Sequence, residues 1–341
     1  MKKRLLISFI ILLIGFVTAA ALFSNIFLRP NAGSEAPYRI FVPAGSTADD
    51  LTDSLFTGEI LKNHKSFLLS ARIKHFSGTV KPGFYRIEAG MSNNKIINMF
   101  RSGRQVPVNV TFNNIRTLNE LAGRVGAQIE ADSSSIMAFL SDPENYSDDG
   151  FTYQTVISVF IPDTYEFYWT TDAKGFYRRM LKEYKSFWND ERLAAADAEG
   201  LDPVEVSTLA SIIDDEASKN DEKPRIAGVY LNRLRLGIPL QSDPTIKFAL
   251  NDFTIRRVLK QHLTVNSPYN TYSNRGLPPG PVRCPTRTAI DAVLNAEKHD
   301  FIYFVARSDF SGYHHFSRTL AEHNRYASAY QHELNKRKIY R

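Results

Sequence analysis

Cysteine is almost absent from this 341-residue chain, in which Cys284 is the only one. A single cysteine forms neither an intramolecular disulfide nor a cysteine-rich zinc site, so it does not indicate the compartment. Excess charge is also scarce: 42 Lys and Arg against 36 Asp and Glu leave a formal net charge of +6. This surplus suits an anionic membrane or envelope polymer as well as nucleic acid. No helix-turn-helix, RRM or zinc-finger pattern supports nucleic acid, which we therefore exclude as a partner.

The motifs of several enzyme classes are missing as well. The chain has no GxSxG, P-loop, GxGxxG or HExxH pattern. His314 and His315 are adjacent, and adjacent residues of a strand point to opposite faces, so they do not form a joint ligand pair. Cys284 precedes Pro285 without a catalytic-histidine signature nearby. We therefore expect no metal, no cofactor and no thiol nucleophile.

Long apolar runs are scarce, and the one that exists lies at the N-terminus. Residues 5–28 contain no charged side chain over 24 positions, enough to cross a hydrocarbon core about 30 Å thick. One span excludes a polytopic transporter, and the basic residues at positions 2–4 favour a cytoplasmic N-terminus. We expect residues 1–28 to form a cytoplasmic tip and an uncleaved transmembrane anchor. The alternative is a cleaved signal peptide, because residues 19–21 are all alanine.

A small module is predicted after the anchor. Residues 29–37 are rich in Pro, Gly and small polar residues and predict a linker. The pattern then predicts a strand, two helices and a strand, namely residues 38–42, a helix capped by Ser46, residues 63–73 and residues 81–87. This order resembles that of glycan-binding LysM modules, so we assign residues 38–105 to a LysM-like βααβ module. The alternative is an α+β packing domain that binds no ligand.

Residues 106–341 predict a second, larger α+β domain. Alternating apolar residues over 106–112 predict a strand, and the run 301–306 predicts a buried strand. Helices are expected at 118–129, 133–140, 176–193 and 319–330, and a loop at 161–167. The expected fold class is α+β, with one transmembrane helix, the LysM-like module and this domain.

One helix of the larger domain has a well-marked start. Asp202 is a good N-cap, Pro203 suits the first helical position and Glu205 completes a capping box three residues later. The helix continues as VEVSTLASIIDDEASK with an apolar stripe. At 3.6 residues per turn, Glu216 falls on this inward stripe.

The inward position of Glu216 has a chemical consequence. Burial disfavours the charged carboxylate and raises its pKa, as a general acid that works near neutrality requires. The two preceding acids, Asp214 and Asp215, are rotated away from the inward face. The alternative is a structural carboxylate that anchors a buried hydrogen-bond network or pairs with an arginine such as Arg225 or Arg233.

Polar and aromatic loops follow this helix. They contain the sequences LQSDPT at 240–245, NSPYNTY at 266–272 and RGLPPGP at 275–281. Aromatic faces with amide and hydroxyl donors suit a sugar polymer, although each loop alone would also fit an ordinary rigid turn. Together with an inward carboxylate, they predict a cleft.

In chain order, the anchor, the LysM-like unit and the motifs PDTYEF, ASIIDDEA, AGVYLNRL, LQSDPT, SPYNTY, GLPPGP and HHFSRTLAEHN closely resemble the YceG-like family. The resemblance covers essentially the whole chain. In that family two acids spaced i, i+2 end the helix, and the second is catalytic. Here the shorter Asp214 stands first and Glu216 is retained. The family continues after GLPPGP to Asn-Pro-Gly, where this chain has Cys284, Pro285 and Thr286.

The resemblance implies an endolytic lytic transglycosylase of peptidoglycan, which is a lyase. It would cleave the β-1,4 bond between N-acetylmuramic acid and N-acetylglucosamine within nascent strands, leave 1,6-anhydro ends and limit strand length. Glu216 would act as general acid and then as general base. The resemblance also implies an inner (cytoplasmic) membrane location, a periplasmic catalytic domain at 106–341, and peptidoglycan synthases as partners.

Ten polar or aromatic residues are our candidates for binding the substrate: Gln241, Asp243, Thr245, Tyr269, Asn270, Tyr272, Ser317, Glu322, His323 and Asn324. Two other functions stay open. A muramidase-type hydrolase would need a second carboxylate, which Asp243 or Glu322 could supply. A non-catalytic, membrane-anchored glycan-binding scaffold would use Glu216 only structurally.

Overall fold

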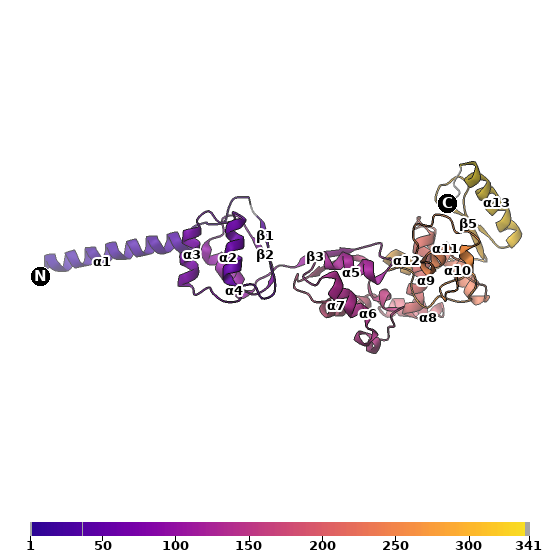
Figure 1. Ribbon diagram of the computed structural model, residues 1–341, viewed down its shortest axis with the longest axis horizontal. Coiled ribbons are helices and arrows are strands. Elements are labelled where there is room, and N and C mark those ends of the chain that lie inside the picture. Colours follow the sequence, from indigo (N-terminus) through magenta and orange to yellow (C-terminus); the bar gives the residue numbers. More distant parts are fainter. Residues whose placement is uncertain (1, 36, 338–341) are drawn as a thin grey trace. The chain divides into compact units, whose positions relative to one another are not determined.

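The computed structural model describes residues 2–35 and 37–337 and has the expected mixed α+β composition, with an apolar helix at the N-terminus (Figure 1). In the described ranges the named strands form three two-stranded sheets. The chain divides into two compact units. The first contains the chain up to Val110 with Gln128–Ala131 and Tyr165–Asp172, and the second contains Thr111–Ala127, Asp132–Thr164 and the chain from Ala173 onward.

The first unit begins with the apolar helix. Helix α1 (Lys2–Phe23) continues directly into a π-helical turn, η1 (Ser24–Leu28), and none of the residues of α1 is buried. Within the described part of the chain, Lys2–Leu28 is the one helix long and apolar enough to cross a membrane, with a mean hydropathy of 2.8. Its length and composition fit the predicted span.

The rest of the first unit is a small module. Its elements are β1 (Tyr38–Val42), α2 (Ala48–Thr57), α3 (His64–Ile73), β2 (Gly83–Ile87) and α4 (Asn93–Ser102). β1 and β2 pair antiparallel, with Tyr38 opposite Ile87. Helices and strands share one core, in which Phe67, Tyr85 and Phe100 are fully buried. The first four elements follow the expected βααβ order, and a LysM-like identity stays a prediction.

The segment expected as a linker is part of this module. The backbone N–H groups of Asn31 and Ala32 both donate to the Met91 carbonyl, at 3.0 and 2.9 Å. Ala32 is fully buried in the module core. The Asn31 side chain accepts from the Asn63 N–H at 2.7 Å and donates to Asn93 Oδ1 at 2.6 Å. Ordered structure therefore joins α1 to the module.

The second unit is mainly helical. Its helices are α5 (Leu118–Gly126), α6 (Ser133–Ser141), α7 (Ala173–Phe187), α8 (Asp190–Ala198), α9 (Pro203–Glu216), α10 (Lys223–Arg235), α11 (Asp243–Ala249), α12 (Arg287–Leu294) and α13 (Leu320–Lys336), with short 3₁₀ turns at Pro143–Asn145, Ser147–Asp149, Val156–Val159 and His262–Thr264. In this unit β5 (Tyr303–Ala306) pairs with β6 (His314–Ser317). The boundary between the units falls within β3 (Val108–Phe112) and β4 (Asp163–Phe167), which pair with each other. β5 is half-buried along its length, whereas we expected a fully buried strand.

Two helix predictions are wrong in detail. The N-cap of α2 is Thr47 and not Ser46, because Thr47 forms a complete capping box with Asp50. The single helix expected over 176–193 is two helices, since the Asn189 side chain accepts from the Arg192 N–H at 3.0 Å and begins α8.

The prediction of a loop at 161–167 is also wrong, because this segment contains strand β4. Tyr165 and Phe167 are buried, whereas Thr164 and Glu166 are exposed. This is the alternation of a half-buried strand. Pro162 and Asp163, taken as turn residues, precede or begin the strand.

Candidate active site

Glu216 is the last residue of α9, a helix with little freedom to move. The predicted capping box is present: Asp202 accepts from the N–H groups of Val204 and Glu205, and Glu205 accepts from the Asp202 N–H. All residues over 206–213 are buried, because α8, α10, α11 and α12 pack against α9 (Figure 1). The fixed helix holds its last residue in a defined place.

Two hydroxyl groups bind one carboxylate oxygen of the half-buried Glu216. The Ser242 hydroxyl donates to Oε1 at 2.7 Å, and the Tyr230 hydroxyl donates to the same atom at 3.1 Å. Tyr230 comes from α10, and Ser242 is the N-cap of α11. An oxygen has two lone pairs, and both of those on Oε1 are used. The proton of the neutral carboxyl group is therefore directed to Oε2.

The surroundings of Glu216 raise its pKa from 4.5 to about 7, chiefly because burial disfavours the charged form. The negative charges of Asp243 and Asp215 act in the same direction. The hydrogen bonds from Ser242 and Tyr230 favour the carboxylate and offset part of the rise. A pKa near neutrality keeps both the acid and its conjugate base populated near neutral pH.

The two arginines considered as partners of Glu216 bind elsewhere. Arg225 forms an ion pair with Glu297 at 2.9 Å. Arg233 donates to the side-chain oxygen of Gln241 at 2.8 Å. A cation close to Glu216 would lower its pKa, and the rise to about 7 is the opposite result.

Asp214 is buried, which contradicts the prediction that it faces away from the interior. Its carboxylate binds Lys223 at 2.6 Å, and the two side chains are only 4% and 6% exposed. It also accepts from the N–H and hydroxyl of Thr286, at 2.8 and 3.0 Å. The prediction fails because α9 is enclosed by helices on several sides, so the apolar stripe does not mark its only inner face.

Asp215 is held in a similar way. It binds Arg283 at 2.6 Å and Arg116 at 3.0 Å, and its side chain is largely buried. Asp214 and Asp215 thus fix the last turn of α9, which carries Glu216.

Two of the predicted cleft residues, Asp243 and Tyr272, belong to the surroundings of Glu216. The Tyr272 hydroxyl donates to Asp243 at 2.6 Å. The charge of Asp243 acts on the pKa of Glu216, and the charge of Glu216 acts on that of Tyr272. Burial raises the pKa of Asp243 as well.

Thr245 and Asn270 are fully buried and support the loops from within. The Thr245 hydroxyl donates to the Ser242 carbonyl at 2.7 Å. The Asn270 amide donates to the carbonyls of Leu263 and Val265. The Thr245 bond fixes the backbone that carries Ser242, and the Asn270 bonds fix the loop of residues 263–270.

Gln241 and His323 are brought together around Arg233. Gln241 accepts from Arg233, whose guanidinium lies 5.3 Å from the ring centroid of Tyr303. The His323 ring stacks on Tyr303 at 5.2 Å. Burial lowers the pKa of His323, and the charge of Arg233 lowers it further.

The remaining predicted residues of the C-terminal segment lie on β6 and α13. Ser317 ends β6 and is fully buried. Glu322 lies in the first turn of α13, where its N–H donates to the N-cap hydroxyl of Thr319 at 3.3 Å. Asn324 is exposed on the same helix.

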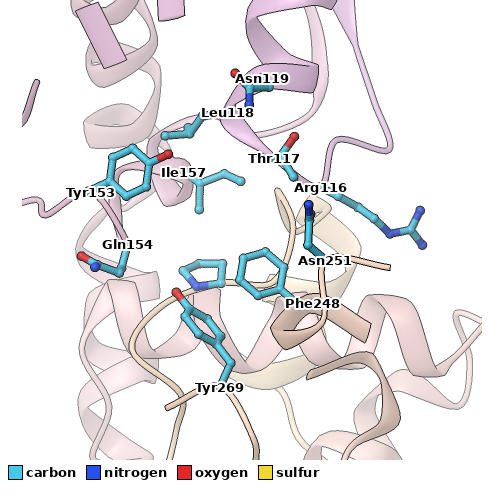
Figure 2. A pocket seen from close by; sticks show the side chains of 11 residues that line it. Arg116, Thr117, Leu118, Asn119, Tyr153, Gln154, Ile157, Phe248, Asn251 and Tyr269 are labelled. Atoms are coloured by element: carbon cyan, nitrogen blue, oxygen red, sulfur yellow. The ribbon is translucent and has the colours of Figure 1, made fainter. Parts of the chain in front are cut away.

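Tyr269 lines a cavity of about 360 Å³ in the second unit, whose lining residues do not include Glu216. Figure 2 shows Phe248 and Tyr269 beside each other, with Tyr153 and Ile157 close by. The ring centroids of Phe248 and Tyr269 are 4.6 Å apart. Arg116 is the one charged residue in the lining, and its charge is bound to Asp215. The cavity therefore offers aromatic faces, hydroxyls and amides without a free charge.

Neither a metal-binding cluster nor a reactive thiol is evident in the described ranges. Within residues 2–35 and 37–337, no group of three or more His, Cys, Asp and Glu could hold a metal ion. Cys284 is fully buried, and burial raises the pKa of its thiol, which disfavours the reactive thiolate.

A family model described as the YceG-like family matches residues 40–329. The chain belongs to the YceG-like family. It is 28% identical to a Bacillus subtilis (strain 168) protein named endolytic murein transglycosylase, over 92% of this chain and 91% of that protein. It is also 28% identical to a protein of the same name from Streptococcus pneumoniae (strain D39), over 89% of this chain and 61% of that protein.

A solved structure of a member of this family is also similar. The crystal structure of a YceG-like protein from Listeria monocytogenes matches with a TM-score of 0.58 at 28% identity, over 86% of this chain and 99% of that chain. The resemblance drawn from the motifs is thus confirmed at the level of the family.

The sequence of this YceG-like chain did not lead us to predict two residues of the site, Ser242 and Tyr230. A tyrosine within the apolar motif AGVYL is a usable signal, because a buried tyrosine hydroxyl generally needs a hydrogen-bond partner. Ser242 lies between the predicted Gln241 and Asp243 in LQSDPT. Nothing local distinguishes it, since its bond to Glu216 joins residues 26 positions apart.

Proposed function

We propose that this protein is a membrane-anchored endolytic murein transglycosylase. It cleaves the β-1,4 bond between N-acetylmuramic acid and N-acetylglucosamine within peptidoglycan strands and forms 1,6-anhydro ends. The observation that carries the proposal is the Glu216 carboxyl group, whose pKa burial raises to about 7 and whose Oε1 is held by two hydroxyls. The name of the relatives that match most of this chain supports the same activity.

The first step uses the neutral form of Glu216. The proton on Oε2 passes to the glycosidic oxygen, and the bond from that oxygen to C1 of the muramoyl sugar breaks. The acetamido oxygen of the same sugar stabilises the positive charge that develops at C1, so no protein nucleophile is needed. Ser242 and Tyr230 stabilise the new carboxylate through their bonds to Oε1.

The second step uses the carboxylate form. Glu216 accepts the proton of the C6 hydroxyl while O6 of the muramoyl sugar bonds to C1 and displaces the acetamido oxygen. The anhydro ring closes, the proton is back on Glu216 and no water is consumed. A single group that gives and then takes a proton works best with a pKa near the working pH.

Replacement of the acid tests the proposal. Glu216→Gln keeps the size of the side chain and removes its proton, so strand cleavage falls at least about 100-fold. Glu205→Gln is the matched control, because Glu205 is exposed at the other end of α9 and a glutamine preserves its capping role. The measurement is chromatography and mass spectrometry of strands digested by the full-length protein. Undiminished cleavage by Glu216→Gln would show that another group is the acid.

Asp243 is the reason to keep a hydrolase as the second candidate, because its charge acts on Glu216 and a second carboxylate can activate water. The products separate the two reactions. A lyase leaves anhydro ends, whereas a hydrolase leaves reducing ends that are heavier by one water molecule. Glycan binding by the wild-type protein without any cleavage would instead indicate a scaffold.

The cavity around Tyr269 gives the glycan strand a second contact, in addition to that at Glu216. Its lining of aromatic faces, hydroxyls and amides, in which the one charged residue Arg116 is paired with Asp215, suits an N-acetylated sugar away from the cut. Tyr153→Ala, which changes a half-exposed residue, raises the KM for long strands up to about tenfold, equivalent to about 1.4 kcal/mol of binding free energy. Tyr168→Ala in the first unit is the control, because Tyr168 is also exposed. Equal KM values for the two variants would remove the cavity from the binding path.

The proposed setting is the inner membrane, with α1 as the span, the small module and the second unit outside the cytoplasm, and peptidoglycan synthases as partners. The apolar α1 and the basic residues before it support this orientation. Cross-linking of the full-length protein in cells tests the partners. Recovery of synthases at no more than background would contradict that part.

A further inference from the structure

The end of the apolar helix is fastened to two helices of the module. The carbonyl of Ile26 in η1 accepts from the Ser70 hydroxyl of α3 at 2.9 Å and from the Asn93 amide of α4 at 2.8 Å. Phe27 is buried beside them. Figure 1 shows α3 at the end of α1. The module is therefore held against the point where α1 ends, and the hydrogen bonds of Asn31 and Ala32 reinforce the attachment.

An apolar stripe of α3 lies on the side of this attachment. Spacings of three and four residues put Leu69 and Ile73 on the same stripe as Ser66 and Ser70. Ser70 binds η1, and Ser66 accepts from the same Asn93 amide that binds η1. The stripe thus borders the end of α1. Leu69 and Ile73 are 41% and 51% exposed, so protein atoms leave much of both side chains uncovered.

The charged side chains of the three helical segments at this attachment have one sign. η1, α3 and α4 contain no Asp or Glu, and their cations are Lys65, Arg72, Lys95 and Arg101. The carboxylates on the module's helices are all on α2, namely Asp49, Asp50 and Asp53. On α3, helical spacing places Lys65 and Arg72 next to the apolar stripe. An apolar stripe flanked by cations is the pattern of helices that lie in the interface of an anionic bilayer.

We propose that α3 is a second membrane contact, in which Leu69 and Ile73 enter the bilayer interface while Lys65 and Arg72 bind anionic phospholipid headgroups. The inference rests on the proposed membrane anchoring by α1. The end of the span supplies the bilayer surface next to the stripe, and the positive charge selects anionic lipids. The contact would fix the module on the membrane instead of leaving it tethered by one helix.

Depth measurements on the full-length protein in vesicles test this contact. A fluorophore is attached to a single cysteine introduced as Leu69→Cys, Ser54→Cys or Ala20→Cys, and quenching by brominated lipids is recorded. The native Cys284 is fully buried and does not compete for the label. Ser54 is exposed on α2, and Ala20 lies within α1. We expect strong quenching at position 20, clear quenching at 69 and several-fold weaker quenching at 54.

The outcomes separate the anchor from the second contact. Quenching at 20 with equal, weak signals at 69 and 54 would overturn the inference and leave the anchor standing. No quenching at 20 would overturn the anchoring, and the inference with it.

The lipid class is tested in the same system. Quenching at 69 should rise when anionic lipid replaces zwitterionic lipid, and Lys65→Gln with Arg72→Gln should abolish the rise. The control variant Arg39→Gln, which removes an exposed cation on β1, should leave the rise unchanged. If inorganic phosphate added to zwitterionic vesicles produces the same rise, the site binds any phosphate and the assignment to headgroups is wrong.

Discussion

Ser242 and Asp243 are neighbours in the chain that act on Glu216 in opposite directions. The hydroxyl of Ser242 lowers the pKa of Glu216, and the charge of Asp243 raises it. The first step of the proposed mechanism needs protonated Glu216, so activity should decline as the pH rises through about 7. Ser242→Ala should move this decline to higher pH and Asp243→Asn to lower pH, each by about one unit.

The measurement is the pH dependence of kcat/KM for strand cleavage. Ser328→Ala is a suitable control, because Ser328 is an exposed residue of α13 outside the candidate binding residues. A purely structural role for Ser242 or Asp243 would lower the rate equally at every pH. Unmoved profiles would therefore contradict the assignment.

The residues that could be predicted are those whose chemistry is visible locally. Glu216 follows from helix spacing, and Asp243 and Tyr272 follow from a polar loop. The Ser242 and Tyr230 bonds to Glu216 could not be predicted, because they depend on how α9, α10 and the loop before α11 pack.

Helix α9 shows how two departures from the family pattern are related. By the resemblance drawn from the motifs, Asp214 is shorter than the acid usual at its position, and Thr286 stands where the family would have glycine. The two residues are in contact, since the Thr286 hydroxyl donates to Asp214 at 3.0 Å. The hydroxyl of Thr286, which a glycine would lack, supplies a partner to the shorter acid, so we expect each departure to offset the other.

A double-mutant cycle measures this compensation. Asp214→Glu crowds a buried ion pair and should lower the free energy of unfolding by about 1–3 kcal/mol. Thr286→Gly removes one hydrogen bond, worth about 1 kcal/mol. The double variant should lose less than the sum by at least about 0.5 kcal/mol, a coupling typical of residues in contact.

The exposed pair of Arg225 and Glu297 provides the control for this cycle. Glu297→Asp should change stability little, because exposed ion pairs contribute about 0–1 kcal/mol. Strict additivity of Asp214→Glu and Thr286→Gly would disprove the compensation.

Start signals in the sequence predicted the start of α9 but not that of α8, and the face of a helix that packing encloses could not be predicted from spacing. The capping box of Asp202 and Glu205 fixed the start of α9. The break was missed although Asn189 is a good N-cap, because a continuous helix was read across it. The strand β4 was missed because Pro162 and Asp163 were taken as turn residues. Packing limits the prediction for α9, whose enclosure by four helices buried Asp214.

At the scale of the whole chain, composition predicted an anchor, a small module and a larger domain. The apolar helix was evident because 24 consecutive residues lack charge. The ordered connection at Asn31 and Ala32 could not be predicted, because Pro, Gly and polar residues are as common in packed turns as in linkers.

Each unit has its own buried aromatic core, which predicts two unfolding transitions. Phe67 is fully buried in the first unit, and Phe176 is fully buried in the second. Phe67→Ala should lower the stability of one transition by about 3–5 kcal/mol, and Phe176→Ala that of the other by a similar amount. Calorimetry of the full-length protein in detergent measures both.

Cleavage activity assigns the transitions, because Glu216 and its partners belong to the second unit. Activity should be lost at the transition that Phe176→Ala moves, and Phe67→Ala should leave that temperature unchanged. A single transition that both variants shift equally would mean that the two cores unfold as one, since independent units do not share the cost of a cavity.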